Sequence, residues 1–292
     1  MLDKMSNFGQ RVLVNSIVVL VVWLIIYYSF AIPFFYITLI AATIAGALSE
    51  LFHLANIKKF NPLATAAIAF STLYTFATYL SIKHVQLAIL PEAILLTALL
   101  SFFGYYLIQG GNPLSNIAMT TFGIAYLAIP LSFLVKINYF FPETSAQDGR
   151  CWLLYTLFVT KMTDTGAYFV GKYIGRTPLA PNLSPKKTLE GAIGGLLTSM
   201  AVSVAFYFIA NVAPQKWCME ITFTQSLLLG ICISILAQFG DLAESLLKRD
   251  AGVKDSNNLP GVGGVFDMVD SIIFTAPLVY LFLQAQFNGV HL

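Results

Sequence analysis

The sequence predicts an all-α integral membrane protein, a polytopic bundle of about nine transmembrane helices with a cytoplasmic N-terminus. Two observations predict this class. Only 10% of the 292 residues are charged and the mean hydropathy is +0.77, whereas about a quarter of the residues of a soluble domain are charged. Apolar runs long enough to cross roughly 30 Å of hydrocarbon also recur along the chain. No low-complexity linker interrupts them, so residues 1–292 are interpreted as a single integral membrane domain.

The first apolar run follows Lys4 and Arg11 and superficially resembles a signal peptide. It is too long for the hydrophobic region of a signal peptide and no small-residue cleavage pattern ends it, so a retained membrane helix is expected. Pro and Gly mark several later breaks, as in AIPF and QGGNP. The predicted spans are Val12–Phe30, Pro33–Ala55, Pro62–Ile82, Leu87–Gln109, Leu114–Ile137, Trp152–Val170, Leu189–Val212, Phe223–Leu247 and Val265–Phe287.

The orientation follows from the positive-inside rule, which places most loop Lys and Arg residues in the cytoplasm. With a cytoplasmic N-terminus, eleven cations fall in inner segments: Lys4, Arg11, Lys58, Lys59, Lys172, Arg176, Lys186, Lys187, Lys248, Arg249 and Lys254. Four fall in outer segments: Lys83, Lys136, Arg150 and Lys216. Two charge-rich segments, 161–190 and 238–271, therefore face the cytoplasm of a bacterial-type cell membrane.

Several classes of protein and site are excluded. A net charge of +2 is too small to indicate a nucleic-acid partner. Cys151, Cys218 and Cys232 lack CxxC spacing, which argues against a disulfide framework or a zinc site. No GxxxxGK[ST] motif is present, so an ordinary P-loop is excluded. The GxxxG spacings of Gly171–Gly175 and Gly191–Gly195 indicate helix packing.

Carboxylates occur where the eighth span ends and the ninth begins, in AQFGDLAESLLKRD and GGVFDMVDS. Helical spacing places Gln238, Asp241, Ser245 and Lys248 on one face of the eighth span. Asp267 and Asp270 likewise share one face at the start of the ninth. The turn-forming segment NNLPGVGG folds the two helices back as an αα-hairpin. Acids within spans normally face a bundle interior or a watery cavity and are functional. Three of them on facing helices match the oxygen ligands that Mg²⁺ requires.

A second charged segment reads KMTDTGAYFVGKYIGRTPLAPNLSPKKTLEGAIGG. Asp164 lies near the cytoplasmic end of the sixth span, and Glu190 opens the seventh after a loop rich in Gly and Pro. Ser184 or Thr188 is expected to cap that helix. A helix N-terminus preceded by two lysines suits an anion such as phosphate. Together the two segments predict a cytoplasm-facing, Mg²⁺-holding site that brings one polar phosphate compound to one lipid.

At these residues the sequence resembles the CDP-diacylglycerol synthases, the phosphatidate cytidylyltransferase family. The stretch SLLKRDAGVKDSNNLPGVGGVFDMVDS resembles the pattern S-x-x-K-R-x4-K-D followed by P-G-H-G-G-x-x-D-R-x-D-S, and QFGDLAES resembles Q-x-G-D-x-x-E-S. The segment from DTGAY to TLEG resembles a further family motif, so the likeness covers roughly residues 161–271. Val262 stands where the family has His, Met268 stands where it has Arg or Lys, and the turn SNNLPG is one residue shorter.

The resemblance implies transfer of the cytidylyl group of CTP to phosphatidate, giving CDP-diacylglycerol and pyrophosphate for phospholipid biosynthesis. The attacking phosphate is already an anion, so the missing His does not remove a required base. CTP, phosphatidate and membrane lipids are the expected partners, and Mg²⁺ is the expected cofactor, with a second cation as an option.

The resemblance also implies roles for individual residues. The expected metal ligands are Asp241 and Asp267, with Asp270 in or next to the coordination shell. The cations expected to bind the triphosphate and the lipid headgroup are Lys187, Lys248, Arg249 and Lys254. Two acids are expected to orient lysines or a second cation: Asp164 and Glu190. The other expected substrate-binding residues are Ser184, Lys186, Thr188, Ser245, Asp255, Gly263 and Gly264.

Two other functions remain open at this point. A CTP-dependent polyprenol or phytol kinase would transfer the γ-phosphate to an alcohol, although S-x-x-K-R-x4-K-D argues against it. A cation-coupled transporter would use the intramembrane acids as an ion path, although no inverted repeat is evident. Residues 1–150 are interpreted as the wall of a lipid cavity or as a homodimer contact.

Overall fold

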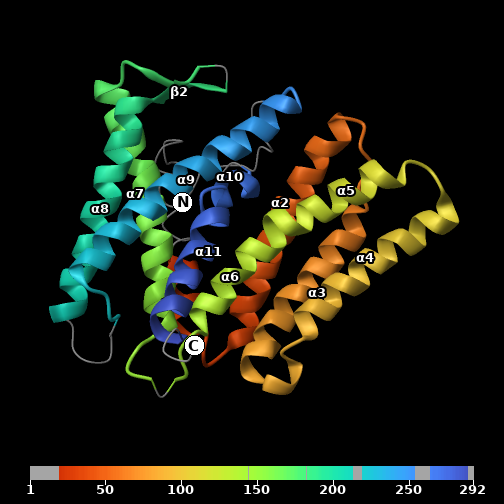
Figure 1. Ribbon diagram of the computed structural model, residues 1–292, viewed down its shortest axis with the longest axis horizontal. Helices are drawn as coiled ribbons and strands as arrows, with labels where there is room; N and C mark the ends of the chain where they lie inside the picture. The colour runs from red at the N-terminus through yellow and green to blue at the C-terminus, as the bar shows by residue number, and fades with distance from the viewer. Residues whose placement is uncertain (1–19, 144, 182, 213–218, 254–263, 289–292) are drawn as a thin grey trace, which may run out of the picture.

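The computed structural model describes residues 20–143, 145–181, 183–212, 219–253 and 264–288. They form a helical bundle with one small hairpin (Figure 1). The helices are α2 (Pro33–Ile57), α3 (Ala64–Lys83), η2 (Val85–Leu87), α4 (Leu90–Gln109), α5 (Pro113–Gly123), η3 (Ile124–Ala128), α6 (Ile129–Asn138), α7 (Gly149–Ile174), α8 (Leu189–Val212), α9 (Phe223–Asp250), α10 (Val265–Val269), α11 (Ile272–Leu283) and η5 (Gln284–Asn288). The strands are β1 (Pro178–Ala180) and β2 (Ser184–Thr188).

Seven helical stretches among the described residues are long and apolar enough to cross a membrane. They are Pro33–Ile57, Ala64–Lys83, Val85–Gln109, Pro113–Asn138, Leu189–Asn211, Phe223–Asp250 and Val265–Phe287. Each agrees with a predicted span to within a few residues, which confirms a multi-pass, helical membrane protein. The first predicted span, Val12–Phe30, begins outside the described residues; of its described part, residues 20–27 are helical.

Helix α7 corresponds to the predicted sixth span but differs from the other seven. It is 26 residues long, yet Lys161, Asp164 and several threonines lower its hydropathy, so it is not one of the seven apolar stretches. It packs closely along α8, as the GxxxG spacings predict. A Cβ atom added at Gly191 would lie 2.8 Å from the carbonyl oxygen of Ala167, and one at Gly195 would lie 3.0 Å from that of Thr163. The polar helix is therefore held by close backbone approach.

The segment between α7 and α8, expected to be a loop, contains the antiparallel pair β1 and β2. These strands are too short to give a recognisable alternation in the sequence. The Thr188 hydroxyl accepts the Gly191 backbone N–H at 3.1 Å, so Thr188 is the residue that caps α8. Oε2 of Glu190 accepts the backbone N–H groups of Arg176 at 3.0 Å and of Thr177 at 3.1 Å, and Oε1 accepts the Thr177 N–H at 3.2 Å. Glu190 thereby closes the base of the hairpin.

The N-terminal half supports the helices that carry the acids. Figure 1 shows α2 between α3 and the α10–α11 pair. Val265 of α10 lies against Gly46 of α2, where an added Cβ would be 3.2 Å from the valine methyl groups. At the surface, Lys58 at the end of α2 also pairs with Asp250 at the end of α9, with Nζ and Oδ1 3.1 Å apart, an exposed contact that contributes little to stability. The structure thus gives residues before 150 a supporting role, which the sequence did not indicate.

Candidate active site

An acidic cluster lies where α9 meets the junction of α10 and α11. One carboxylate oxygen each from Asp241, Glu244 and Asp270 lies within 4.8 Å of the others. Glu244 is 2% exposed and Asp270 is 6% exposed. Burying several carboxylates together is costly unless a cation or a hydrogen-bond donor compensates them. Their oxygens are the ligands that a hard divalent cation prefers, so this group, defined here as the acidic cluster, fits Mg²⁺.

The backbone between α10 and α11 brings Asp270 into this cluster. The sequence predicted one continuous helix over Val265–Phe287, but α10 ends at Val269 and α11 begins at Ile272. The resulting junction lies directly against Gly240 of α9, where any side chain would overlap the Asp270 carbonyl oxygen. Glycine at position 240 therefore permits the close approach that places Asp270 beside Asp241.

Lys248 and Asp267 form a second layer against the acidic cluster. The Lys248 ammonium lies 2.8 Å from Oε2 of Glu244 and 2.6 Å from Oδ1 of Asp267. Asp267 also accepts the Gly264 backbone N–H at 3.3 Å. The acidic cluster thus contains Glu244, whereas the sequence pointed to Asp267 as the partner of Asp241. Glu244 was detectable, because it lies in QFGDLAES three residues after Asp241 and four before Lys248.

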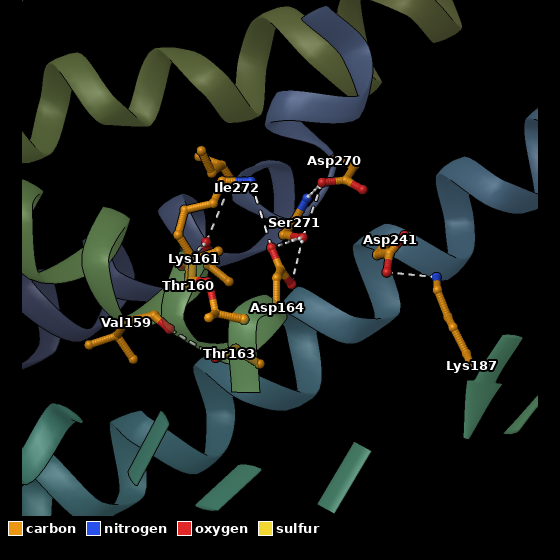
Figure 2. A network of polar contacts seen from close by, with 12 residues as sticks. Val159, Thr160, Lys161, Thr163, Asp164, Lys187, Asp241, Asp270, Ser271 and Ile272 are labelled. Carbon is orange, nitrogen blue, oxygen red and sulfur yellow. Dashed lines mark hydrogen bonds and ion pairs between the residues drawn. The ribbon is translucent and has the colours of Figure 1, made fainter. Parts of the chain in front are cut away.

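A cavity of about 560 Å³ opens beside the cluster, between α7, the hairpin, the start of α8 and α9. Its volume falls in the range of small-molecule and cofactor sites. Its polar lining residues are Asp164, Tyr168, Lys172, Ser184, Lys186, Lys187, Thr188, Gln238 and Asp241. The Lys187 ammonium lies 2.7 Å from Oδ2 of Asp241 and so connects the cavity with the acidic cluster (Figure 2).

Asp164 extends the polar network from α7. The Ser271 hydroxyl lies 3.2 Å from Oδ2 of Asp164 and 3.1 Å from Oδ1 of Asp270. The Lys161 ammonium lies 3.6 Å from Oδ2 of Asp164. Figure 2 shows Asp164 pointing toward Ser271, with Lys161 to one side and the Asp241–Lys187 pair to the other.

The remaining predicted residues are placed as follows. Arg249 donates to the Leu183 and Val253 carbonyl oxygens, each at 3.2 Å, and so holds the hairpin loop near the end of α9. Ser245 is half-buried on α9, and Met268 is exposed on α10. Three of the expected site residues lie outside the described residues, Lys254, Asp255 and Gly263, as do Val262 and the SNNLPG turn.

Glu50 is a site residue that the sequence reasoning missed. It lies on α2 and is buried, and its two carboxylate oxygens accept the backbone N–H groups of Val265 and Phe266, each at 2.9 Å. A carboxylate at a helix N-terminus satisfies amides that have no partner within the helix. Glu50 therefore fixes the start of α10, which carries Asp267. Because acids within membrane spans are usually functional, Glu50 could have been singled out from the sequence on the same ground as Asp241.

Replacing Glu50 with Gln is expected to leave one buried N–H of α10 without a good acceptor. A buried unpaired donor costs about 1–3 kcal/mol, so the apparent melting temperature is expected to fall. Because α10 positions Asp267, turnover is expected to fall about tenfold. Thermal melting in detergent and initial rates of product formation check this. Glu92→Gln, the same change at an exposed residue of α4, is the control; equal behaviour of the two variants would contradict the role.

Tyr126 is a second residue that the sequence did not indicate. It lies in the π-helical turn η3, and π-helical turns occur frequently at functional sites. Its ring packs against Phe266 and Phe274, with centroids 6.1 Å away in each case, and these residues flank Asp270 by four positions on each side. Its buried hydroxyl, which is within electrostatic range of Glu244 and Asp270, has no hydrogen-bond partner among the described residues. The N-terminal half thus contributes a polar group next to the acidic cluster.

Comparison with known proteins gives consistent matches. Residues 9–286 match the family model described as the cytidylyltransferase family. The chain is 32% identical to the phosphatidate cytidylyltransferase of Chlamydia pneumoniae over 96% of its own length and 94% of that protein. It is 32% identical to that of Bacillus subtilis over 74% and 73%, respectively. An alignment with the Chlamydia muridarum protein of the same name gives 34% identity but covers only 59% of that relative.

Proposed function

Because this chain belongs to the cytidylyltransferase family, we propose that the acidic cluster and the adjoining cavity are its catalytic centre. Its activity is that of a phosphatidate cytidylyltransferase, or CDP-diacylglycerol synthase. The reaction joins a phosphate oxygen of phosphatidate to the α-phosphorus of CTP and breaks the bond from that phosphorus to the oxygen of the leaving pyrophosphate. The observation that supports this centre is the Lys187–Asp241 pair, which links a nucleotide-sized cavity to carboxylates suited to a metal.

Mg²⁺ is proposed to bind at Asp241, Glu244 and Asp270. The donor set fits, because it consists of closely spaced carboxylate oxygens, two of them deeply buried. When bound, such a cation neutralises the charge that develops on transferring phosphates. Lys248 and Asp267 are proposed to orient Glu244, because Lys248 is only 12% exposed and contacts both acids. Metal-supporting residues of this kind commonly affect activity about 10–100-fold.

CTP is proposed to occupy the cavity of about 560 Å³. Lys186, Lys187 and Ser184 line it near the capped start of α8, and backbone N–H groups at a helix N-terminus favour phosphate. Lys187 would exchange its partner Asp241 for a triphosphate oxygen. The chain's own residues then position the reacting phosphates and neutralise their charge, which is the main contribution of proteins to phosphoryl transfer.

The catalytic end of the bundle is proposed to face the cytoplasm of the cell membrane, where CTP is dissolved. The β1–β2 hairpin, the end of α9 and the α2–α3 turn lie at the same end of the bundle (Figure 1). The cations at this end include Lys58, Lys59, Lys186, Lys187 and Arg249. More Lys and Arg residues lie at this end than in the loops at the opposite end, which supports this orientation. A homodimer stays a prediction from the sequence.

The proposed function is tested with purified protein, phosphatidate, Mg²⁺ and CTP labelled separately at the α- and γ-phosphates. We expect the α-label in lipid and the γ-label in pyrophosphate. The γ-label in lipid would indicate the lipid-kinase alternative instead. If neither label reaches lipid while the Bacillus subtilis relative is active in parallel, the catalytic assignment is wrong and the transporter alternative gains weight.

A further inference from the structure

Lys161 is a cation within a membrane helix that the proposed catalytic centre does not use. It lies midway along α7, and its side chain is 44% exposed. Charged residues at such depth are rare and normally serve a substrate or ion path. Its nearest acid, Asp164, is 3.6 Å away, whereas Lys187 and Lys248 have carboxylates at 2.6–2.8 Å. The ion pair of Lys161 is thus the longest of the lysine–carboxylate pairs at the site. Its ammonium is therefore the one that most readily exchanges its carboxylate for another anion.

The other cations near the acidic cluster are either held by closer contacts than Lys161 or face the cavity proposed for CTP. Lys248 is held between Glu244 and Asp267, and Arg249 donates to two backbone carbonyl oxygens. Lys187 faces the cavity proposed for CTP. The lipid phosphate, which carries up to two negative charges near neutral pH, needs a cation of its own. Among the described residues, Lys161 best meets this requirement.

The position of Lys161 also suits a ligand that arrives from the bilayer. On α7 it follows Leu154 and Leu157, which are likewise partly exposed, at spacings of three and four residues. It is not among the residues that line the CTP cavity, although Asp164 is. A hydrogen bond of 3.0 Å between Thr160 and Thr275 docks this part of α7 on α11. Figure 2 shows Lys161 beside the Asp164–Ser271–Asp270 network. Its place after Leu154 and Leu157 on α7 therefore puts it where an apolar stripe reaches that network.

We propose that Lys161 binds the phosphomonoester group of the lipid substrate and presents it to the acidic cluster from the side opposite Lys187. This inference rests on the proposed function and adds to it a separate site for the lipid headgroup. Phosphatidate keeps its acyl chains in the bilayer, so its phosphate approaches along the apolar stripe. The ammonium exchanges Asp164 for the lipid phosphate, and an oxygen of that phosphate then faces the α-phosphorus of CTP.

The test compares Lys161→Met and Lys161→Arg with wild type in mixed micelles, varying phosphatidate and CTP separately. A charge-assisted contact is worth about tenfold to a hundredfold in affinity. We therefore expect the KM for phosphatidate to rise about that much in Lys161→Met, while the KM for CTP changes less than about twofold. Lys161→Arg, which keeps the charge, is expected to recover most of the loss. Lys58→Met, at the exposed pair with Asp250, is the control and is expected to match wild type.

Binding without turnover gives an independent measurement. With CTP absent, native mass spectrometry counts phosphatidate retained by each variant, with diacylglycerol as the lipid that lacks the phosphate. We expect Lys161→Met to lose the preference for phosphatidate and Lys161→Arg to keep it. If Lys161→Met fails to fold, as judged by its melting curve, Lys161→Gln takes its place.

Two results would overturn the inference. One is an unchanged KM for phosphatidate with unchanged retention of the lipid. The other is a parallel rise in both KM values and in the Mg²⁺ requirement, which would mean that Lys161 only balances the charge of Asp164 and Asp270. If wild-type protein is active, either result contradicts the lipid site at Lys161 and leaves the proposed function standing. Absence of cytidylyl transfer in wild type would instead contradict the proposed function.

Discussion

Replacing Asp241 with Asn is expected to lower kcat for CDP-diacylglycerol formation by about a thousandfold or more. Asp241 belongs to the acidic cluster and pairs with Lys187, so one substitution weakens the proposed metal site and releases the lysine proposed to bind CTP. A bound divalent cation contributes several kcal/mol of charge stabilisation, and each 1.4 kcal/mol corresponds to about tenfold in rate. Raising the Mg²⁺ concentration is expected to restore little of the loss.

This prediction is checked by initial rates over a Mg²⁺ series and by direct Mn²⁺ binding followed by electron paramagnetic resonance. The matched control is Asp250→Asn on the same helix. Asp250 is 66% exposed and pairs only at the surface with Lys58, and exposed pairs of this kind contribute about 0–1 kcal/mol. The control is expected to retain wild-type turnover. Full activity and unchanged Mn²⁺ binding in Asp241→Asn would refute the metal site.

Replacing Gly240 with Ala is expected to lower kcat by about a hundredfold, although the change adds only one methyl group. The new Cβ would overlap the Asp270 carbonyl oxygen and lie 3.1 Å from Cα of Ser271. Because backbone atoms cannot rotate away, α9 and the α10–α11 junction must separate. A displacement of about 1 Å in a catalytic group can cost about a hundredfold in rate. Overpacking of this kind also costs about 1–3 kcal/mol of stability.

The control for this variant is Gly104→Ala on α4, where an added Cβ meets nothing within 4 Å. Alanine is favoured over glycine within helices by roughly 0.5–1 kcal/mol, so the control is expected to be at least as stable as wild type and fully active. Thermal melting and turnover of the two variants separate the local contact from the general effect of the substitution. Wild-type kcat in Gly240→Ala would show that α9 and the junction need not lie so close.

The site draws on both halves of the chain. The acids and most of the cations come from α7, the hairpin and α9–α11, which agrees with the motifs in the sequence. Glu50 and Tyr126 come from the N-terminal half and contact α10 or the residues around Asp270. The N-terminal helices therefore support the proposed catalytic centre.

Much of the fold could be read from the sequence because hydropathy over about twenty residues is a local property. Seven spans were located to within a few residues on that basis, and the motif around Ser245–Ser271 carried the resemblance to the family. Asp241, Asp270 and Lys187 could be singled out because charge within or beside a span is exceptional. The sequence by itself therefore determined the class, the approximate spans and two of the three acids of the acidic cluster, Asp241 and Asp270.

The tertiary structure decided which of these groups meet. Glu244 lies in the acidic cluster while Lys248 holds Asp267, because the rotation of α9 against α10 sets which oxygens converge. Glu50 reaches Val265 and Phe266 across 215 and 216 positions of the chain, a distance that no local pattern spans. The approach of Asp270 to Asp241 depends on the absent side chain of Gly240 and on a break in the last span. Such contacts arise from the packing of helices distant in sequence, which periodicity and spacing do not encode.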